Sequence, residues 1–256
     1  FFIGDYNYNK KIKKVITVYD LIHEISFKDY NLDKDSYPKK KYLENSDLII
    51  CITNNTKNDL INFYKINPNK IKVINIGISD FSVYKPDKRL IPNDPYLLYV
   101  GYRGKYKNFK NLLISLSLSK SILNDFKLIC FGGGNFTDEE KRLMYSKNIN
   151  PQNVIQISGD DNCLVSLYSN ARAFIFPSIY EGEGLPPIEA MSLGCPVICS
   201  NRQAIIEGTG DAAVLFNPND PEDILSKIEK TVDLEKDIKN LKKIYLQKSK
   251  LFSMDR

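Results

Sequence analysis

Two glutamates, Glu181 and Glu189, have seven residues between them and flank a glycine-rich turn. The apolar run 173–176 predicts a buried strand before the turn, and Pro186-Pro187 predicts a helix start after it. We place Glu181 in the loop and Glu189 in the first turn of the helix. Carboxylates accept hydrogen bonds from hydroxyls, and the N–H groups of a helix start bind phosphate. The stretch therefore suits a ligand with hydroxyl groups on both sides of a diphosphate, such as a sugar nucleotide.

The same spacing also fits an ordinary strand, turn and helix in which a glutamate stabilises the helix start. The residue pattern alone leaves both interpretations open. Gly194 and Pro196 end the helix, and 197–199 begins the next strand.

A second group of charged residues follows the predicted strand 96–101. Arg103, Lys105 and Lys107 lie between this strand and a helix that begins near Asn108. Arginine can bind two phosphate oxygens at once, whereas lysine acts as a point charge. A strand-to-helix loop with these cations is therefore expected to bind a diphosphate.

The elements around these loops alternate between strand and helix. Strands are predicted at 128–131 and 154–157. The three glycines 132–134 are a weak signal, since a tight turn before the helix capped by Thr137 and Glu140 explains them equally well. Ser158 to Asp161 lead into a further helix, and a lysine-rich amphipathic helix is predicted over 234–251.

The first part of the chain shows the same alternation on a smaller scale. Strands are predicted at 14–20, 47–52 and 71–76, with helices over 37–45 and from Asn54 or Asn55 to 64. This order predicts a parallel α/β half-domain. His23 follows the first strand at its carboxyl end, where open α/β sheets bind ligands, and it either enters that cleft or lies on the surface.

Periodicity is lost from Gly77 to Pro95, where three prolines and several charges occur. We therefore predict a first domain over 1–81, a linker over 82–94 and a second domain over 95–256.

The segment from Glu181 to Met191, followed by Gly194-Cys-Pro-Val197, resembles the paired-glutamate signature of retaining glycosyltransferases of the group-one (family four) type. The resemblance implies the GT-B fold, an α/β architecture of two Rossmann-like parallel-sheet domains. The first domain is then an incomplete acceptor-side domain and the second binds the nucleotide sugar. The first residues lack an initiator methionine, so we expect a fragment that lacks the start of the N-terminal domain and the extreme C-terminus.

The resemblance also assigns roles to single residues. Gly101 to Asn108 is similar to the family's phosphate-binding loop, which implies that Arg103 and Lys107 bind the donor diphosphate and that Lys105 is solvated. Glu181 would position the transferred sugar and Glu189 the ribose. The remaining candidates are the diphosphate-facing amides of Gly184 and Leu185, the nucleotide-side residues Gly132, Gly133 and Asp161, and the acceptor-side residues Tyr19, Asp20 and His23.

Two positions differ from the family pattern. Glu183 occupies a position where phenylalanine is usual, and it is expected to bring negative charge near the diphosphate. Tyr19 occurs where many relatives have histidine. Tyrosine is also found there in relatives that transfer mannose to cell-surface glycans, which suggests a GDP-linked mannose donor.

The amino-acid composition argues against several classes of protein. The 256 residues are 43% hydrophobic, and 36 basic against 31 acidic residues give a net charge of +5, which indicates a solvated lysine-rich surface rather than a nucleic-acid site. Five dispersed cysteines and a single histidine favour buried reduced thiols in a cytoplasmic protein and argue against a metal site. No apolar run approaches the roughly 20 residues that span a bilayer.

We therefore expect a metal-independent retaining hexosyltransferase without a cofactor. It would move a sugar from a nucleotide-diphosphate sugar to a glycan or lipid-linked hydroxyl acceptor in polysaccharide synthesis. A cytoplasmic location is compatible with peripheral association at the inner face of the membrane. The alternatives are a GT-B sugar-nucleotide epimerase and a non-catalytic sugar-nucleotide-binding partner subunit.

Overall fold

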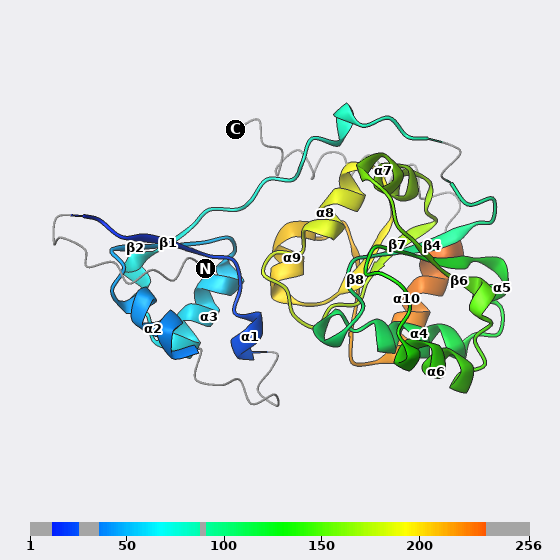
Figure 1. Cartoon of the computed structure of the whole chain (residues 1–256), viewed down its shortest axis with the longest axis horizontal. Helices are drawn as coiled ribbons and strands as arrows, with labels where there is room; N and C mark the ends of the chain where they lie inside the picture. Colours follow the sequence, from blue (N-terminus) through cyan, green and yellow to red (C-terminus); the bar gives the residue numbers. More distant parts are fainter. Residues whose placement is uncertain (1–11, 26–35, 88–90, 234–256) are drawn as a thin grey trace. The chain divides into compact units, whose positions relative to one another are not determined.

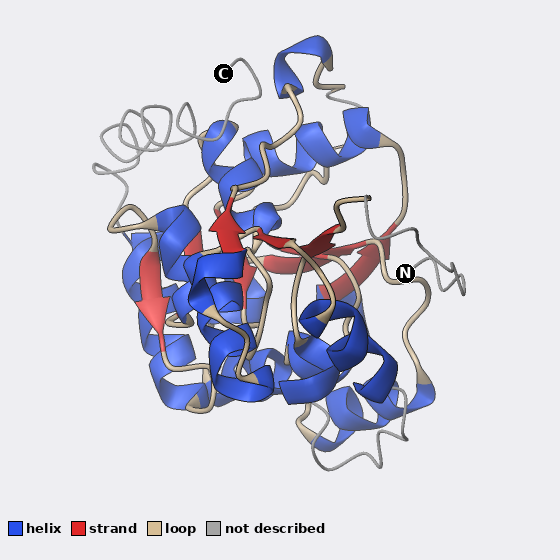
Figure 2. Ribbon diagram, turned by 90° about the vertical axis from the view of Figure 1, so that its left-hand side faces the viewer, coloured by secondary structure: helices blue, strands red, loops and turns tan. Residues whose placement is uncertain are grey.

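The computed structural model describes residues 12–25, 36–87 and 91–233. The chain forms two compact units, Phe1–Asn75 and Ile76–Arg256, and each is described by itself (Figure 1). In both units, strands alternate with helices along the chain. Figure 2 shows the strands in red and the helices in blue. The helix predicted over 234–251 lies outside the described residues.

The first unit contains a three-stranded parallel sheet in the order β1-β2-β3. Its elements in chain order are β1 (Val15–Val18), α1 (Ile22–Ile25), α2 (Ser36–Glu44), β2 (Leu48–Cys51), α3 (Asn54–Tyr64) and β3 (Ile71–Val73).

Local hydrogen bonds decide where the helices of the first unit begin. Asp20 accepts the N–H of Ile22 through Oδ1 at 2.9 Å, which starts α1, a helix not predicted from the sequence. Thr53, and not Asn54 or Asn55, caps α3, because its extended backbone lets its side chain accept the N–H of Thr56.

The second unit is built on a six-stranded parallel sheet in the order β6-β5-β4-β7-β8-β9. The strands are β4 (Tyr96–Val100), β5 (Lys127–Phe131), β6 (Val154–Ile157), β7 (Ala173–Phe176), β8 (Val197–Ser200) and β9 (Val214–Phe216). The helices are α4 (Phe109–Leu118), α5 (Ile122–Asp125), α6 (Asp138–Ser146), α7 (Asp161–Asn170), α8 (Leu185–Ser192), α9 (Gln203–Thr209) and α10 (Pro221–Asp233).

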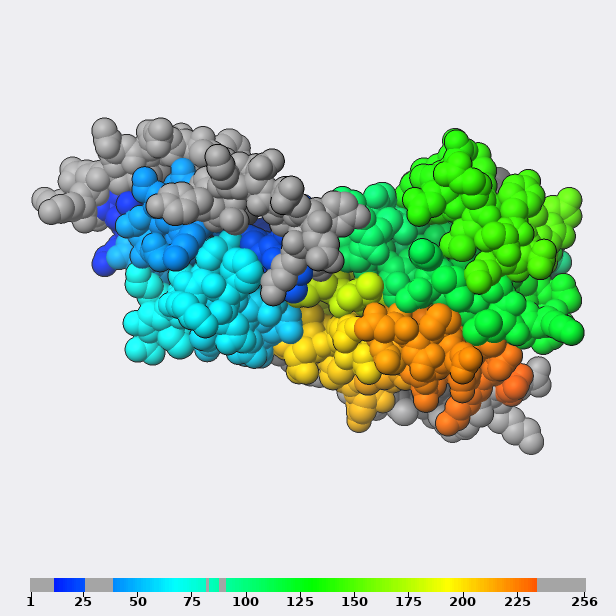
Figure 3. All heavy atoms as spheres, turned by 90° about the horizontal axis from the view of Figure 1, so that it is seen from below, coloured from blue at the N-terminus to red at the C-terminus, as the bar shows by residue number. Residues whose placement is uncertain are grey.

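Helices cover both faces of this sheet (Figure 1). Successive side chains of a strand point to opposite faces, so Leu97 and Tyr99 of β4 pack with α4, α6 and α10, whereas Tyr96 and Leu98 pack with α7, α8 and α9. Helix α10, orange in Figure 3, forms part of the outer surface and turns Ile224 and Ile228 toward the core. Both faces of the sheet are therefore buried, as expected for parallel strands.

The segment that precedes β4 lies along α7. The hydroxyl of Tyr84 donates to Oδ2 of Asp161 at 2.8 Å, and the N–H of Asp87 donates to Oγ of Ser166 at 2.7 Å. Residues 84–87, which we expected to be part of the linker, thus lie within the second unit and are hydrogen-bonded to α7. All five cysteines are buried free thiols, as expected.

Candidate active site

The sheet of the second unit reverses its strand order between β4 and β7. Chain order runs outward from β4 through β5 to β6 on one side, and from β7 through β8 to β9 on the other. In open parallel sheets, ligands bind outside the carboxyl ends of the strands at such a reversal, because the loops there leave toward opposite faces. The loops at this point are 101–108 after β4 and 177–184 after β7, and they hold four of the candidate residues, Arg103, Lys107, Glu181 and Gly184.

Lys107 and Glu181 meet at this reversal. The Nζ of Lys107 lies 2.7 Å from Oε1 of Glu181, and the two side chains are 17% and 13% exposed. The ammonium group also lies 5.3 Å from the ring centre of Phe176, the last residue of β7. A cation and a carboxylate are thus held side by side, partly shielded from water, where a phosphate and a hydroxyl group could bind them.

Backbone and side-chain hydrogen bonds join the two loops. The N–H of Ile179 donates to the carbonyl of Tyr106 at 2.7 Å. The side-chain amide of Asn108 donates to the carbonyls of Pro177 and Pro218 at 3.1 and 2.7 Å. Asn108 is buried and adopts a left-handed conformation with φ of 57°. The sequence suggested Asn108 only as a helix-start residue, and its role between loops had no signal in the sequence.

Helix α8 begins at the end of the loop that carries Glu181. Gly184 precedes it in a left-handed conformation with φ of 80°. Leu185 is the first helical residue, and Pro186 and Pro187 follow, as predicted from their early position. The N–H groups at this helix start and the positive end of its dipole favour an anion.

Glu189 lies in the second turn of α8 and not in the first, because the helix already begins at Leu185. Burial raises the pKa of its carboxyl, the hydrogen bond from Tyr168 opposes that rise, and the charge of Asp161 adds to it. The hydroxyl of the buried Tyr168 lies 3.4 Å from Oε2. Tyr168 was not singled out in the sequence, where it is only one apolar position of a helix.

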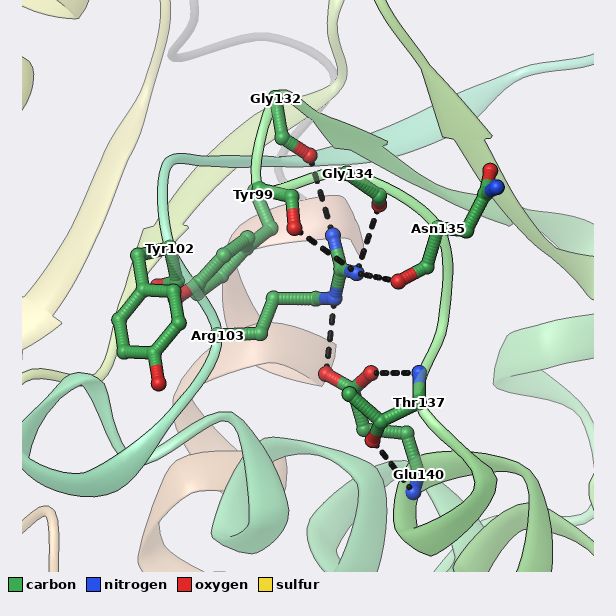
Figure 4. Close-up of polar contacts among 9 residues, drawn as sticks. Tyr99, Tyr102, Arg103, Gly132, Gly134, Asn135, Thr137 and Glu140 are labelled. Carbon is green, nitrogen blue, oxygen red and sulfur yellow. Dashed lines mark hydrogen bonds and ion pairs between the residues drawn. The ribbon is translucent and has the colours of Figure 1, made fainter.

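Arg103 occupies a different place from the one expected. Its side chain is 3% exposed and forms an ion pair with Glu140 at 2.8 Å (Figure 4). Its remaining nitrogens donate to carbonyls of the turn that contains Gly132 and Gly133. The expected grip of this guanidinium on two diphosphate oxygens would require these bonds to break. Of the two expected cations, Lys107 is therefore better placed than Arg103 to bind a diphosphate.

The other candidates lie at the edges of this region or in the first unit. Asp161 is the first residue of α7 and binds Tyr84, as described above. Glu183, which we expected to bring negative charge near the diphosphate, is 3% exposed, so its carboxylate is buried within the protein. In the first unit, Tyr19 is 59% exposed, Asp20 caps α1 and His23 is exposed within α1.

Two kinds of feature are absent from the described residues. Within 12–25, 36–87 and 91–233, no group of three or more His, Cys, Asp and Glu side chains is arranged to hold a metal ion. Among the same residues, no helix has the length and apolar character needed to cross a membrane.

The fold and the site define an α/β protein whose second unit is a doubly wound parallel sheet with a polar site at its strand reversal. The model of the family "Glycosyl transferases group 1" matches residues 80–247. The chain belongs to this family. The expected α/β fold class is confirmed by the two parallel sheets and by the solved structures that the chain resembles, which are GT-B glycosyltransferases.

Among curated relatives, O-antigen chain mannosyltransferase B of Escherichia coli is 27% identical over 85% of this chain and 61% of its own length. The serotype-specific mannosyltransferase WbdA of Escherichia coli is 28% identical over 94% of this chain and 32% of its own length. The chain therefore spans less than two thirds of these relatives.

Two solved structures illustrate the likeness of fold. A glycosyltransferase from Rickettsia africae ESF-5 matches with a TM-score of 0.74 and 22% identity, over 94% of this chain and 66% of that one. Anabaena Alr3699/HepE in complex with UDP and glucose matches with a TM-score of 0.78 and 16% identity, over 93% of this chain and 67% of that one.

Proposed function

We propose that the protein is a retaining glycosyltransferase that moves a sugar from a nucleotide-diphosphate donor to a hydroxyl group of an acceptor. The observation that carries this proposal is the Lys107 and Glu181 pair, held 2.7 Å apart at the strand reversal beside the start of α8. A nucleotide sugar offers a diphosphate to the cation and helix start, and sugar hydroxyls to the carboxylate.

In the proposed site, Lys107 and the amides of Gly184 and Leu185 bind the diphosphate. Glu181 accepts hydrogen bonds from hydroxyls of the transferred sugar. Glu189 accepts them from the ribose, and its partly desolvated carboxylate strengthens such bonds. Gly132, Gly133 and Asp161 border the nucleotide.

The chemistry that we propose breaks the bond between the anomeric carbon and the diphosphate oxygen. The acceptor hydroxyl attacks the anomeric carbon from the face that the diphosphate leaves, so the configuration is retained. The proton of the hydroxyl passes to the departing diphosphate oxygen. Lys107 and the helix-start amides stabilise the charge that grows on the leaving group, a contribution of about 3 kcal/mol per donor in comparable sites.

Mannose is the sugar that we propose, with a GDP-linked donor. It is supported by the two mannosyltransferases named above and by the Val18-Tyr19-Asp20 sequence at the end of β1. The names of relatives also support a glycan acceptor, since they include an O-antigen chain enzyme and a capsular polysaccharide enzyme. If the acceptor is lipid-linked, the enzyme would act at the cytoplasmic surface of the membrane.

Binding is tested first with GDP, UDP and dTDP sugars. A nucleotide present at about a hundred times its dissociation constant should add roughly 2.7 kcal/mol to the stability of the folded state. Glu189→Ala should lose this stabilisation, whereas Glu222→Ala, which alters an exposed glutamate of α10, should keep it. Equal nucleotide affinity of wild type and Glu189→Ala would contradict our placement of the ribose.

Transfer is tested by release of GDP from GDP-mannose with and without a mannose-containing acceptor. Release that depends on the acceptor supports transfer. Conversion of the donor to another sugar nucleotide without release would support the epimerase instead. Binding without either reaction would support a non-catalytic subunit.

A further inference from the structure

The guanidinium of Arg103 is enclosed by the turn that follows β5 (Figure 4). Its Nη1 donates to the carbonyl of Gly132 at 3.0 Å. Its Nη2 donates to the carbonyls of Gly133, Gly134 and Asn135 at 3.5, 2.8 and 3.0 Å. Four successive carbonyls of one turn therefore converge on a single buried side chain.

The turn can take this shape because its first three residues are glycines. Gly132, Gly133 and Gly134 have φ of 77°, 69° and 72°, a left-handed run that other residues rarely adopt. A Cβ on Gly133 would lie 2.7 Å from the carbonyl oxygen of Gly101 and 2.8 Å from Nη1 of Arg103. The glycines and the arginine thus fit one another closely.

The direction of the carbonyls fixes the direction of the N–H groups. In a planar trans peptide, the C=O of one residue and the N–H of the next point in opposite directions. The N–H groups of Gly133, Gly134 and Asn135 therefore point away from Arg103, and all three residues are exposed. They form a row of donors beyond the carboxyl end of β5, the strand next to β4.

The charge of Arg103 is already balanced inside the protein. Its Nε donates to Oε1 of Glu140 at 2.8 Å, and Oε2 of Glu140 accepts the N–H of Thr137 at 2.6 Å. Glu140 thus closes the start of α6 and binds Arg103 at the same time. Drawing the guanidinium out to a ligand would leave this carboxylate without its cation in a partly buried site, which is costly.

We infer that Arg103 is a positioning residue that turns the 132–135 peptide groups so that their N–H donors face the oxygen atoms of a bound nucleotide sugar. This role rests on the proposed function, and it replaces direct contact of Arg103 with the diphosphate. Rows of oriented peptide N–H groups are a common way to bind phosphate and other anionic oxygens.

The test compares Arg103→Lys with Arg142→Lys in the full 256-residue chain. Lysine keeps the positive charge but cannot reach four carbonyls and Glu140 together, whereas Arg142 is an exposed arginine of α6. Each protein is labelled with ¹⁵N-glycine, and the amide signals of Gly132 to Gly134 are recorded with and without GDP, UDP and dTDP. Dissociation constants and melting temperatures are measured on the same samples.

We expect Arg103→Lys to shift the three glycine signals in the nucleotide-free protein and to weaken binding of the preferred nucleotide about tenfold. Arg142→Lys should do neither. Free-state glycine signals that match wild type in Arg103→Lys would overturn the inference, as would shifted signals with unchanged affinity.

Two further outcomes keep this inference apart from the proposed function. Absence of nucleotide binding by wild type would count against the proposed function, while the free-state signals would still decide whether Arg103 holds the turn. If Arg103→Lys does not fold, Glu140→Gln serves instead, since glutamine preserves the cap of α6 but removes the charge that holds Nε. It should shift the same signals, and unchanged signals would overturn the inference.

Discussion

The ammonium group of Lys107 lies 2.7 Å from the carboxylate of Glu181, across two loops that leave adjacent strands toward opposite faces of the sheet. A free diphosphate and Glu181 would therefore compete for the same cation. We predict that Glu181→Gln binds free GDP or UDP about threefold to tenfold more tightly than wild type, because Lys107 no longer has a charged partner. Sugar transfer should fall in the same variant, because glutamine is a weaker acceptor for sugar hydroxyls.

Calorimetry with the free nucleotide and acceptor-dependent release from the donor measure these two effects. Lys107→Met should weaken both binding and transfer, whereas Lys110→Met, at an exposed lysine of α4, should change neither. Weaker nucleotide binding in Glu181→Gln would show that Glu181 does not compete with the diphosphate for Lys107.

The side chain of Asn108 should contribute to the stability of the folded protein. Asn108→Gly keeps the left-handed backbone but removes the side-chain donor to the carbonyls of Pro177 and Pro218. Asn111 still donates to the carbonyl of Pro218 at 3.0 Å, so the carbonyl that loses its donor is that of Pro177. We expect a loss of about 2 kcal/mol in the free energy of unfolding. Urea unfolding measures it, with Asn148→Gly as control because that exposed residue has φ of 55°. Equal losses of unfolding free energy in both variants would mean that the side-chain hydrogen bonds of Asn108 contribute nothing to stability.

The sequence predicted features that depend on local pattern. The capping box of Thr137 and Glu140 is present, and the strands that precede both loops lie where their apolar runs indicated. Such features follow from the order of residue types along a few turns of chain, which is why they can be predicted without tertiary contacts.

The position of Arg103 could not be predicted in this way. The sequence showed a cation in a strand-to-helix loop, which suits a ligand and an internal partner equally well. Its burial depends on a turn about 30 residues later whose carbonyls face it. Helix α9 was not predicted, for a related reason: it is a short helix of 7 residues that packs against Gly184 and α8, which lie earlier in the chain.

The five buried cysteines should be unreactive in the folded protein. Burial raises the pKa of the thiol of Cys51 to about 11 and that of Cys199 to about 12, so little thiolate forms near neutral pH. An aromatic disulfide reagent at pH 8 should label none of the five within minutes and all five in urea. Ser146→Cys, which adds an exposed thiol on α6, should label at once. Rapid labelling of wild type would show that a cysteine region opens readily.

The buried carboxylate of Glu189, which we propose binds the ribose, should lower the free energy of unfolding at neutral pH. Because burial raises its folded-state pKa above the ordinary 4.5, the folded protein keeps this proton at pH values where the unfolded chain has lost it. The free energy of unfolding therefore falls as pH rises from 4.5 through the raised pKa, and the loss persists at higher pH.

Glu189→Gln removes this titration and keeps the shape of the side chain. We expect a higher melting temperature than wild type at pH 7, and a difference that shrinks toward zero below pH about 4, where the wild-type carboxyl is also neutral. Nucleotide affinity should fall about tenfold in the same variant, because a neutral amide is a weaker acceptor for ribose hydroxyls than a carboxylate. Scanning calorimetry from pH about 3 to 8 measures the first effect, with Glu222→Gln on the surface of α10 as the control for removing one negative charge. A stability difference that does not depend on pH would show that Glu189 affects stability through packing and not through its charge.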